Sequence, residues 1–265
     1  MTLVWRPGYT WNETVWNPSM IQTALWLDAA DASTVTTVSG AVSQWNDKSG
    51  NGRHASQSTS GARPALQAAQ LNNKSVIFFS PTTTPDYLDT FTSPISGTGS
   101  YSIFSLAQTS SSSFSYLVGQ GGGNTGDPGL GIATTSNGYY GFIQDSSRQV
   151  FTTIGTNSAD GNYRIRADIF NRASSWTLSV NGSLIGSESI SSRSGSLTGT
   201  TPFRIGVYSN ATGGFWNGSI AEVIIISSAA DTITSQKIEG YLAHKWGLEA
   251  NLPNDHPYKT TGPTP

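Results

Sequence analysis

Short hydrophobic runs, some of them alternating with polar residues, follow one another along most of this chain and are separated by turn-forming residues. Runs of about four to eight residues that are rich in β-branched and aromatic side chains predict strands. The predicted strands cover residues 24–28, 75–79, 101–107, 139–143, 150–154, 163–170, 176–180, 183–185, 203–208 and 215–226. Many short strands with short connections predict a β-sandwich or a barrel, and no fixed-period repeat indicates a propeller.

Two local signals add detail to this pattern. Asn181-Gly182 lies between two predicted strands and predicts a tight hairpin, because both turn positions need a positive φ. Residues 231–247 have a helical period instead, with Asp231 or Thr234 placed to cap the helix and Gly247 placed to end it. The apolar positions on one face of this helix are Ile238, Tyr241, Leu242 and Trp246.

Composition and charge exclude several classes of protein. Hydrophobic residues make up 36% of the 265 positions, which is too many for a disordered chain. Charged residues make up 11% and the formal net charge is −2, so we expect no nucleic-acid partner. We find no apolar run long enough to cross a bilayer and no signal-peptide pattern. We therefore expect synthesis in a cytoplasm without a membrane partner.

Several motifs, taken in order, carry a resemblance to a known family. Residues 24–31, 42–54 and 75–79 resemble the opening of laminin-G-like, concanavalin-A-like jelly-roll domains, and residues 176–182, 203–206 and 215–226 resemble their closing strands. Residues 238–248 resemble the C-terminal helix of a subgroup found in tailed-phage virion proteins and bacterial surface proteins. The resemblance implies an all-β jelly-roll sandwich of two antiparallel sheets with one C-terminal helix. It also implies a glycan or partner site on the concave face or a loop edge.

We expect three segments along the chain. Residues 23–258 form the jelly-roll domain, with its helix at about 234–246, and residues 259–265 form a tail. Residues 1–22 form an aromatic arm that contains Trp5, Trp11 and Trp16. Trp is frequent at interface hot spots, so these rings are candidates for docking on a partner. The alternative is that they cover an edge of their own domain.

The segment 47–52 has the oxygen-bearing side chains and the glycine of a calcium loop. Ser58 stands where such a loop needs a bidentate Glu, so we favour a hydrogen-bonded turn and expect no cofactor. Should calcium bind, the candidate ligands are Asp28, Asp31, Asp47 and Asn51.

Catalytic groups are sparse. The chain has five Glu, no two of them close neighbours, and lacks the Glu-x-Asp-x-x-Glu strand that the family's glucanases use to flank a glycosidic bond. Glu222 alone cannot supply both an acid and a nucleophile. His54, His244 and His256 match no metal or nucleophile–base spacing. We expect a protein that is not an enzyme.

Exposed aromatics beside amides would suit a glycan, because sugars present apolar faces ringed by hydroxyl groups. Tyr139 and Tyr140 are adjacent in one predicted strand, so they must point to opposite faces and one of them is a candidate for exposure. The possible glycan-binding residues are Tyr139, Tyr140, Trp176, Tyr208, Asn210 and Trp216.

These observations favour a non-enzymatic structural or accessory protein of a tailed-phage virion, either a capsid decoration or a fibre or adhesin. It would dock through its N-terminal arm on other virion proteins and form a homo-oligomer. The alternative is a lectin-like carbohydrate-binding module that recognises a cell-surface polysaccharide of the host. A glycoside hydrolase is the third and least favoured interpretation.

Overall fold

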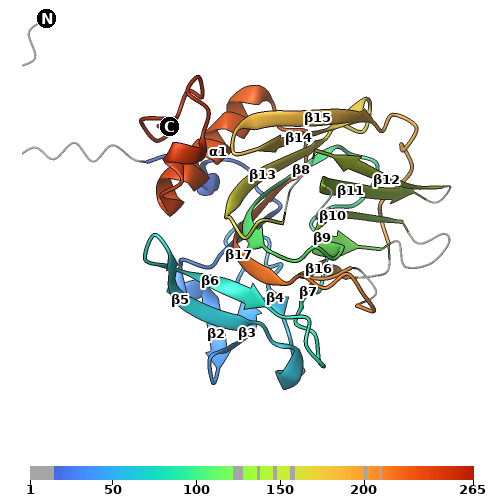
Figure 1. Ribbon diagram of the computed structural model, residues 1–265. Helices are drawn as coiled ribbons and strands as arrows, with labels where there is room; N and C mark the ends of the chain where they lie inside the picture. Colours follow the sequence, from blue (N-terminus) through green and yellow to red (C-terminus); the bar gives the residue numbers. More distant parts are fainter. Residues whose placement is uncertain are drawn as a thin grey trace, which may run out of the picture.

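The computed structural model describes residues 15–121, 128–135, 138–145, 148–155, 159–199, 202–208 and 211–265. The strands pair antiparallel and form two facing sheets (Figure 1). The sandwich predicted from the hydrophobic pattern is therefore confirmed. Between β14 and β15, Asn181 and Gly182 have φ values of 50° and 76°, as the predicted hairpin requires.

Sheet one is built around β8 and β17, two long strands that pair along most of their length. The order across it is β15-β14-β13-β8-β17-β1, and β6 and β5 continue it beside the start of β17. Its strands are β1 (Leu25–Asp28), β5 (Ala65–Leu71), β6 (Lys74–Phe79), β8 (Tyr101–Thr109), β13 (Arg164–Phe170), β14 (Ser175–Val180), β15 (Ser183–Ser189) and β17 (Gly218–Ile226).

Sheet two has the order β12-β11-β10-β9-β16-β7-β4-β3-β2. A single pairing of Ala41 with Ala65, between β3 and β5, joins it to sheet one. Its strands are β2 (Val35–Val38), β3 (Ala41–Trp45), β4 (Ala55–Ser56), β7 (Leu88–Thr90), β9 (Ser115–Gln120), β10 (Gly129–Thr135), β11 (Gly138–Asp145), β12 (Arg148–Ile154) and β16 (Phe203–Ile205).

The main hydrophobic core lies between the two sheets. On β17, Val223 and Ile225 face this core, whereas Ile224 faces the other side of sheet one. Gly141 on β11 lets the ring of Trp176 lie against sheet two, since a Cβ atom there would come within 2.8 Å of that ring. Alternation along each strand therefore determines which side chains meet inside the sandwich.

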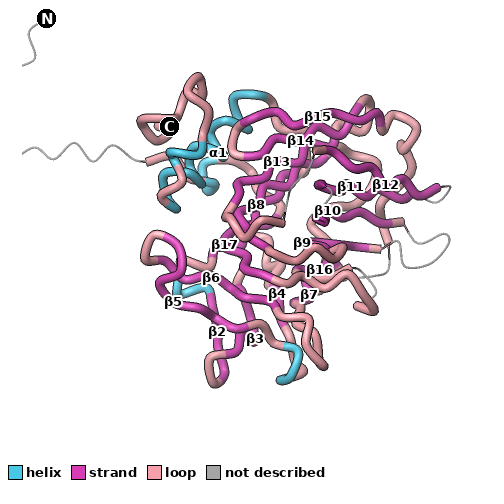
Figure 2. The backbone as a smooth tube through the Cα atoms, viewed as in Figure 1, coloured by secondary structure: helices cyan, strands magenta, loops and turns pink. Residues whose placement is uncertain are grey.

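The helix α1 (Thr232–Trp246) packs on the outer face of sheet one and forms a second core there. The Asp231 carboxylate accepts a hydrogen bond from the Thr234 amide at 2.7 Å, and Gly247 ends the helix with a φ of 70°. Figure 2 shows this helix in cyan to one side of the magenta strands, close to the C-terminus. Short 3₁₀ turns are η1 (Pro18–Met20), η2 (Ala32–Thr34), η3 (Ser60–Ala62) and η4 (Glu249–Asn251).

Candidate functional site

Five aromatic rings form a continuous cluster on the outer face of sheet two, the face turned away from the main core. We call Phe114, Tyr116, Tyr140, Phe142 and Tyr208 the aromatic cluster. The ring of Phe114 lies 5.0 Å from that of Tyr116 and 4.7 Å from that of Tyr140, between centroids. Tyr208 lies 4.7 Å from Tyr116 and 6.0 Å from Phe142.

Three rings of the aromatic cluster are partly exposed, and the other two support them. Phe114, Tyr140 and Tyr208 reach solvent, whereas Tyr116 and Phe142 are buried. Burial raises the pKa of the Tyr116 hydroxyl, so this ring stays neutral. The result is a neutral, apolar surface edged by phenol groups, carried by β9, β11 and the segments just before β9 and just after β16.

The strand geometry explains which predicted aromatics belong to this surface. Tyr139 points into the main core and Tyr140 points outward, so the two adjacent tyrosines do face opposite sides. Tyr140 and Tyr208 belong to the aromatic cluster, whereas Trp176 and Trp216 are buried in the main core. Asn210 lies outside the described residues.

Three members of the aromatic cluster were not predicted from the sequence. The missed residues are Phe114, Tyr116 and Phe142. Each stands two positions from another member of the cluster, since Phe114 pairs with Tyr116 and Phe142 with Tyr140. Aromatic residues two positions apart in one extended segment are the signal, because such side chains point to the same sheet face.

The proposed calcium ligands are occupied by protein donors. Lys48 Nζ lies 2.9 Å from Asp28 Oδ2 and 2.7 Å from Asp31 Oδ2. The Asp47 carboxylate accepts from the backbone amides of Trp26, Ser49 and Arg53, so it closes the hydrogen-bonded turn. Asn51 donates to the Thr23 carbonyl at 2.9 Å. Within the described residues, no group of three or more His, Asp or Glu side chains could hold a metal ion.

Glu222 is fully buried between sheet one and α1, and four donors surround its carboxylate. Trp26 Nε1 donates to Oε1 at 2.8 Å and the Tyr241 hydroxyl donates to the same oxygen at 2.9 Å. Trp246 Nε1 and Lys245 Nζ both donate to Oε2 at 2.7 Å. Burial raises the pKa of Glu222, and the Lys245 ammonium opposes that rise.

Further charges extend this arrangement, which we call the helix–sheet cluster: Trp26, Asp28, Asp31, Lys48, Glu222, Tyr241, Lys245 and Trp246. Lys245 Nζ also lies 2.6 Å from Asp28 Oδ1, so it joins two buried carboxylates. The hydrogen bond from Lys48 lowers the pKa of Asp31 to about 2. Because its donors and acceptors satisfy one another and Glu222 is closed to solvent, the cluster anchors α1 and does not present Glu222 to a substrate.

A second buried ion pair was not predicted. Arg166 and Asp168 on β13 point into the sandwich, with Arg166 Nε 2.6 Å from Asp168 Oδ2. Arg166 also donates to the carbonyls of Ala133 and Tyr140 in sheet two, and Trp176 Nε1 donates to Asp168 at 3.0 Å. This pair therefore links the two sheets behind the aromatic cluster.

The arm residue Trp16 is buried on its own domain. Its ring centroid lies 6.1 Å from that of Tyr241 on α1, and its amide donates to the Pro263 carbonyl at 3.1 Å. Trp16 thus covers an edge of its own fold, as the alternative interpretation of the arm expects. Trp5 and Trp11 lie outside the described residues.

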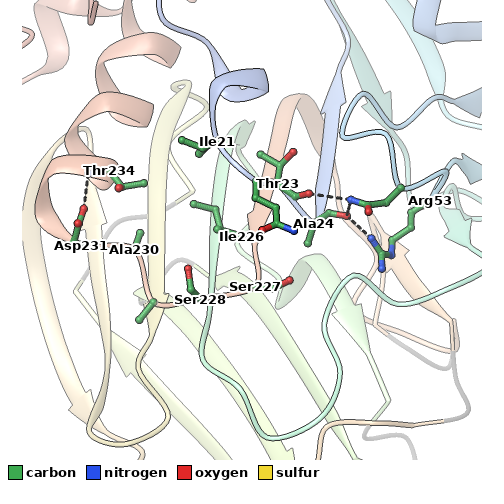
Figure 3. Close-up of a pocket in the computed structure, with 13 residues that line it drawn as sticks. Ile21, Thr23, Ala24, Arg53, Ile226, Ser227, Ser228, Ala230, Asp231 and Thr234 are labelled. Atoms are coloured by element: carbon green, nitrogen blue, oxygen red, sulfur yellow. Dashed lines mark hydrogen bonds between the residues drawn. The ribbon is translucent and has the colours of Figure 1, made fainter. Parts of the chain in front are cut away.

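A groove of about 570 Å³ lies between the start of β1, the end of β17 and the first turn of α1 (Figure 3). Arg53 donates to the Ala24 carbonyl at 2.8 Å on one side, and Asp231 caps α1 through Thr234 on the other. None of the described residues that line the groove is aromatic. It therefore lacks the flat apolar surface on which a sugar ring stacks, and we place the candidate site at the aromatic cluster.

No family model and no curated protein matches the sequence. Among solved structures, the chain is similar to the binding domain of Paraclostridial Mosquitocidal Protein 1, with a TM-score of 0.60 and 13% identity, over 84% of this chain and 52% of that chain. It is similar to botulinum neurotoxin type C, in a structure concerned with cell entry through two ganglioside molecules, with a TM-score of 0.59 and 14% identity, over 83% and 51% of the two chains.

An arabinofuranosidase complexed with arabinofuranosyl-α-1,2-xylobiose is a further similar structure, with a TM-score of 0.57 and 13% identity, over 84% of this chain and 59% of that chain. The chain therefore spans little more than half the length of these structures. At these identities the likeness establishes the β-sandwich fold. No helix in the described part of the chain has the length and hydropathy needed to cross a bilayer.

Proposed function

We propose that this protein is a lectin-like carbohydrate-binding module that recognises a cell-surface glycan through the aromatic cluster. The observation that carries the proposal is the contiguous set of partly exposed rings at Phe114, Tyr140 and Tyr208 on one sheet face. Tyrosine combines a flat apolar ring with a polar hydroxyl, which matches the apolar C–H face and surrounding hydroxyls of a sugar. Such rings also lose little conformational entropy on binding.

Two further observations support this proposal. The structures similar to this chain include one concerned with ganglioside binding and one with a bound arabinofuranosyl-xylobiose, so related folds present surfaces to sugars. The buried Tyr116 and Phe142 hold the exposed rings in place, so the surface is organised before a ligand arrives.

A glycan array with the full chain tests the proposal. We expect a saturable signal, with affinity for the best glycan reduced about tenfold by Tyr140→Ala and by Tyr208→Ala, which corresponds to about 1.4 kcal/mol for each lost stacking contact. Phe91→Ala is the matched control, because Phe91 is 89% exposed and lies outside the aromatic cluster. A blank array, or equal losses in all three variants, would contradict the proposal.

The tailed-phage virion role, with docking on other virion proteins and homo-oligomer formation, remains a prediction from the sequence. It is compatible with glycan binding, since an adhesin on a particle needs a surface that recognises its host. Deletion of residues 1–14 tests the docking part: we expect the domain to stay folded and to lose its attachment to particles.

A further inference from the structure

A narrow cavity lies between the two sheets, where β8 ends and β13 begins. We call it the inter-sheet cavity. Ser105 on β8, Thr134 on β10 and Trp216 before β17 line its inner part, and Tyr139 forms one wall. The cavity holds about 20 Å³, the room that one water-sized group needs.

Four polar atoms on residues that line this cavity have no hydrogen-bond partner within the described chain. They are Ser105 Oγ, Thr134 Oγ1, Arg164 Nε and Trp216 Nε1. Ser105, Thr134 and Trp216 are only 1%, 3% and 2% exposed, so bulk solvent does not satisfy them. Buried polar atoms normally have partners, so four such exceptions at one cavity call for a partner that the described chain does not supply.

The charges around the cavity are already paired. Arg166 donates hydrogen bonds to Asp168 and to two backbone carbonyls of sheet two. Arg164 forms an ion pair with Asp160. The unpaired groups are therefore two N–H donors and two hydroxyls, which donate or accept. The hydroxyl group of a ligand can bond these groups, because it accepts a hydrogen bond from an N–H and donates one to a hydroxyl oxygen.

The cavity has a polar mouth. Asn162 is exposed, and Gln108 and Arg164 are partly exposed, so the lining runs from solvent inward to Ser105 and Trp216. A ligand that enters here meets amide side chains first and the unpaired hydroxyls last. The space admits the hydroxyl group at the end of such an arm and leaves the rest of the ligand at the mouth.

We propose that the inter-sheet cavity binds the primary hydroxyl arm of a small neutral polyhydroxyl compound, either a free polyol or a terminal sugar. This site goes beyond the glycan surface proposed above. Thr134 and Tyr139 face the interior of the sandwich, whereas Ala133 and Tyr140 face the aromatic cluster on the opposite side of sheet two. The two sites therefore act independently.

The test follows the indole N–H resonance of Trp216 in the ¹⁵N-labelled full chain, assigned with Trp216→Phe. Glycerol probes a free polyol, and methyl glucopyranoside with its 6-deoxy analogue probes a sugar arm. We expect a saturable shift with glycerol, or with the glucoside and not its 6-deoxy analogue. The double variant Ser105→Ala/Thr134→Val should weaken binding at least tenfold.

The matched control is Ser102→Ala, which removes a buried serine on the same strand whose hydroxyl already bonds Ser228 and Ala230. It should leave the Trp216 response unchanged, as should Tyr140→Ala, which tests the aromatic cluster separately. The proposal is overturned if no probe gives a saturable shift, or if the double variant binds as the parent does. A crystal structure with only water in the cavity at molar glycerol would also overturn it.

Discussion

The helix–sheet cluster and the inter-sheet cavity both bury polar side chains against sheet one, but on its opposite faces. In the helix–sheet cluster, Glu222 receives four hydrogen bonds, and Lys245 joins it to Asp28. In the inter-sheet cavity, Ser105, Thr134 and Trp216 each have a polar atom with no partner among the described residues. Buried polar groups that satisfy one another hold a fold together, whereas unpaired ones have bonding capacity left for a ligand.

This difference in hydrogen bonding distinguishes a structural cluster from a binding site, which residue type alone does not. A buried glutamate beside a lysine, a tyrosine and two tryptophans could be taken for a catalytic site from its composition. The contacts show that each carboxylate oxygen of Glu222 accepts two hydrogen bonds, from Trp26 and Tyr241 at Oε1 and from Lys245 and Trp246 at Oε2. The inter-sheet cavity has less conspicuous residues, and its unfilled hydrogen-bond capacity makes it the better candidate for binding.

The largest expected effect comes from breaking the helix–sheet cluster with Glu222→Gln. The variant leaves the Lys245 ammonium without one of its two buried carboxylates and places an amide N–H among donors. We expect a loss of about 3–5 kcal/mol in the free energy of unfolding, measured by urea denaturation.

Glu188→Gln is the control for this substitution, because Glu188 is exposed on β15. It should change the free energy of unfolding by no more than about 0.5 kcal/mol. A loss below about 1 kcal/mol for Glu222→Gln would mean that the cluster does not anchor α1 as its contacts indicate.

Local patterns in the sequence predicted those parts of the fold that depend on neighbouring residues. The hairpin at Asn181-Gly182 and the caps of α1 follow from backbone conformations that few residues adopt, so they could be read directly. Strand β5 was missed, because most of its side chains are exposed or half-buried and its Gln and Ala residues do not alternate in hydropathy.

Contacts between distant segments could not be predicted in the same way. Trp26 meets Glu222 across 196 positions, and the inter-sheet cavity combines residues from β8, β10, β13 and the segment before β17. The opposite orientations of Tyr139 and Tyr140 followed from strand alternation. Which of the two lies outside depends on how the sheets face each other, which periodicity does not specify.

A pH titration separates a carboxylate beside a cation from a buried carboxylate whose donor is a backbone amide. Asp31 beside Lys48 has a pKa of about 2, whereas burial raises the pKa of Asp86, whose donor is the Ser80 amide, to about 6. Asp86 binds its proton more tightly in the folded state, so stability should fall as the pH rises from about 4 to 6.

The substitution Asp86→Asn should remove this pH dependence. The variant and the parent should have similar stability near pH 4, and the variant should be more stable by up to about 3 kcal/mol above pH 6, given the shift from 3.8 to about 6. Urea denaturation across this range measures the difference, with the exposed Asp255→Asn as control. Parallel curves for parent and Asp86→Asn would show that the Asp86 carboxyl ionises equally easily in both states.

The smallest expected effect compares two serines on β8. Ser102 Oγ donates to the Ser228 carbonyl and accepts from the Ala230 amide, both at 2.8 Å, so Ser102→Ala should cost about 1–2 kcal/mol. Ser105 Oγ has no such partner in the described chain, so Ser105→Ala should change stability by no more than about 0.5 kcal/mol without polyol. Equal losses in urea denaturation would show that the Ser105 hydroxyl is already satisfied in the free protein. The helix–sheet cluster and the inter-sheet cavity would then no longer differ in hydrogen bonding at Ser105, the residue on which the comparison most depends.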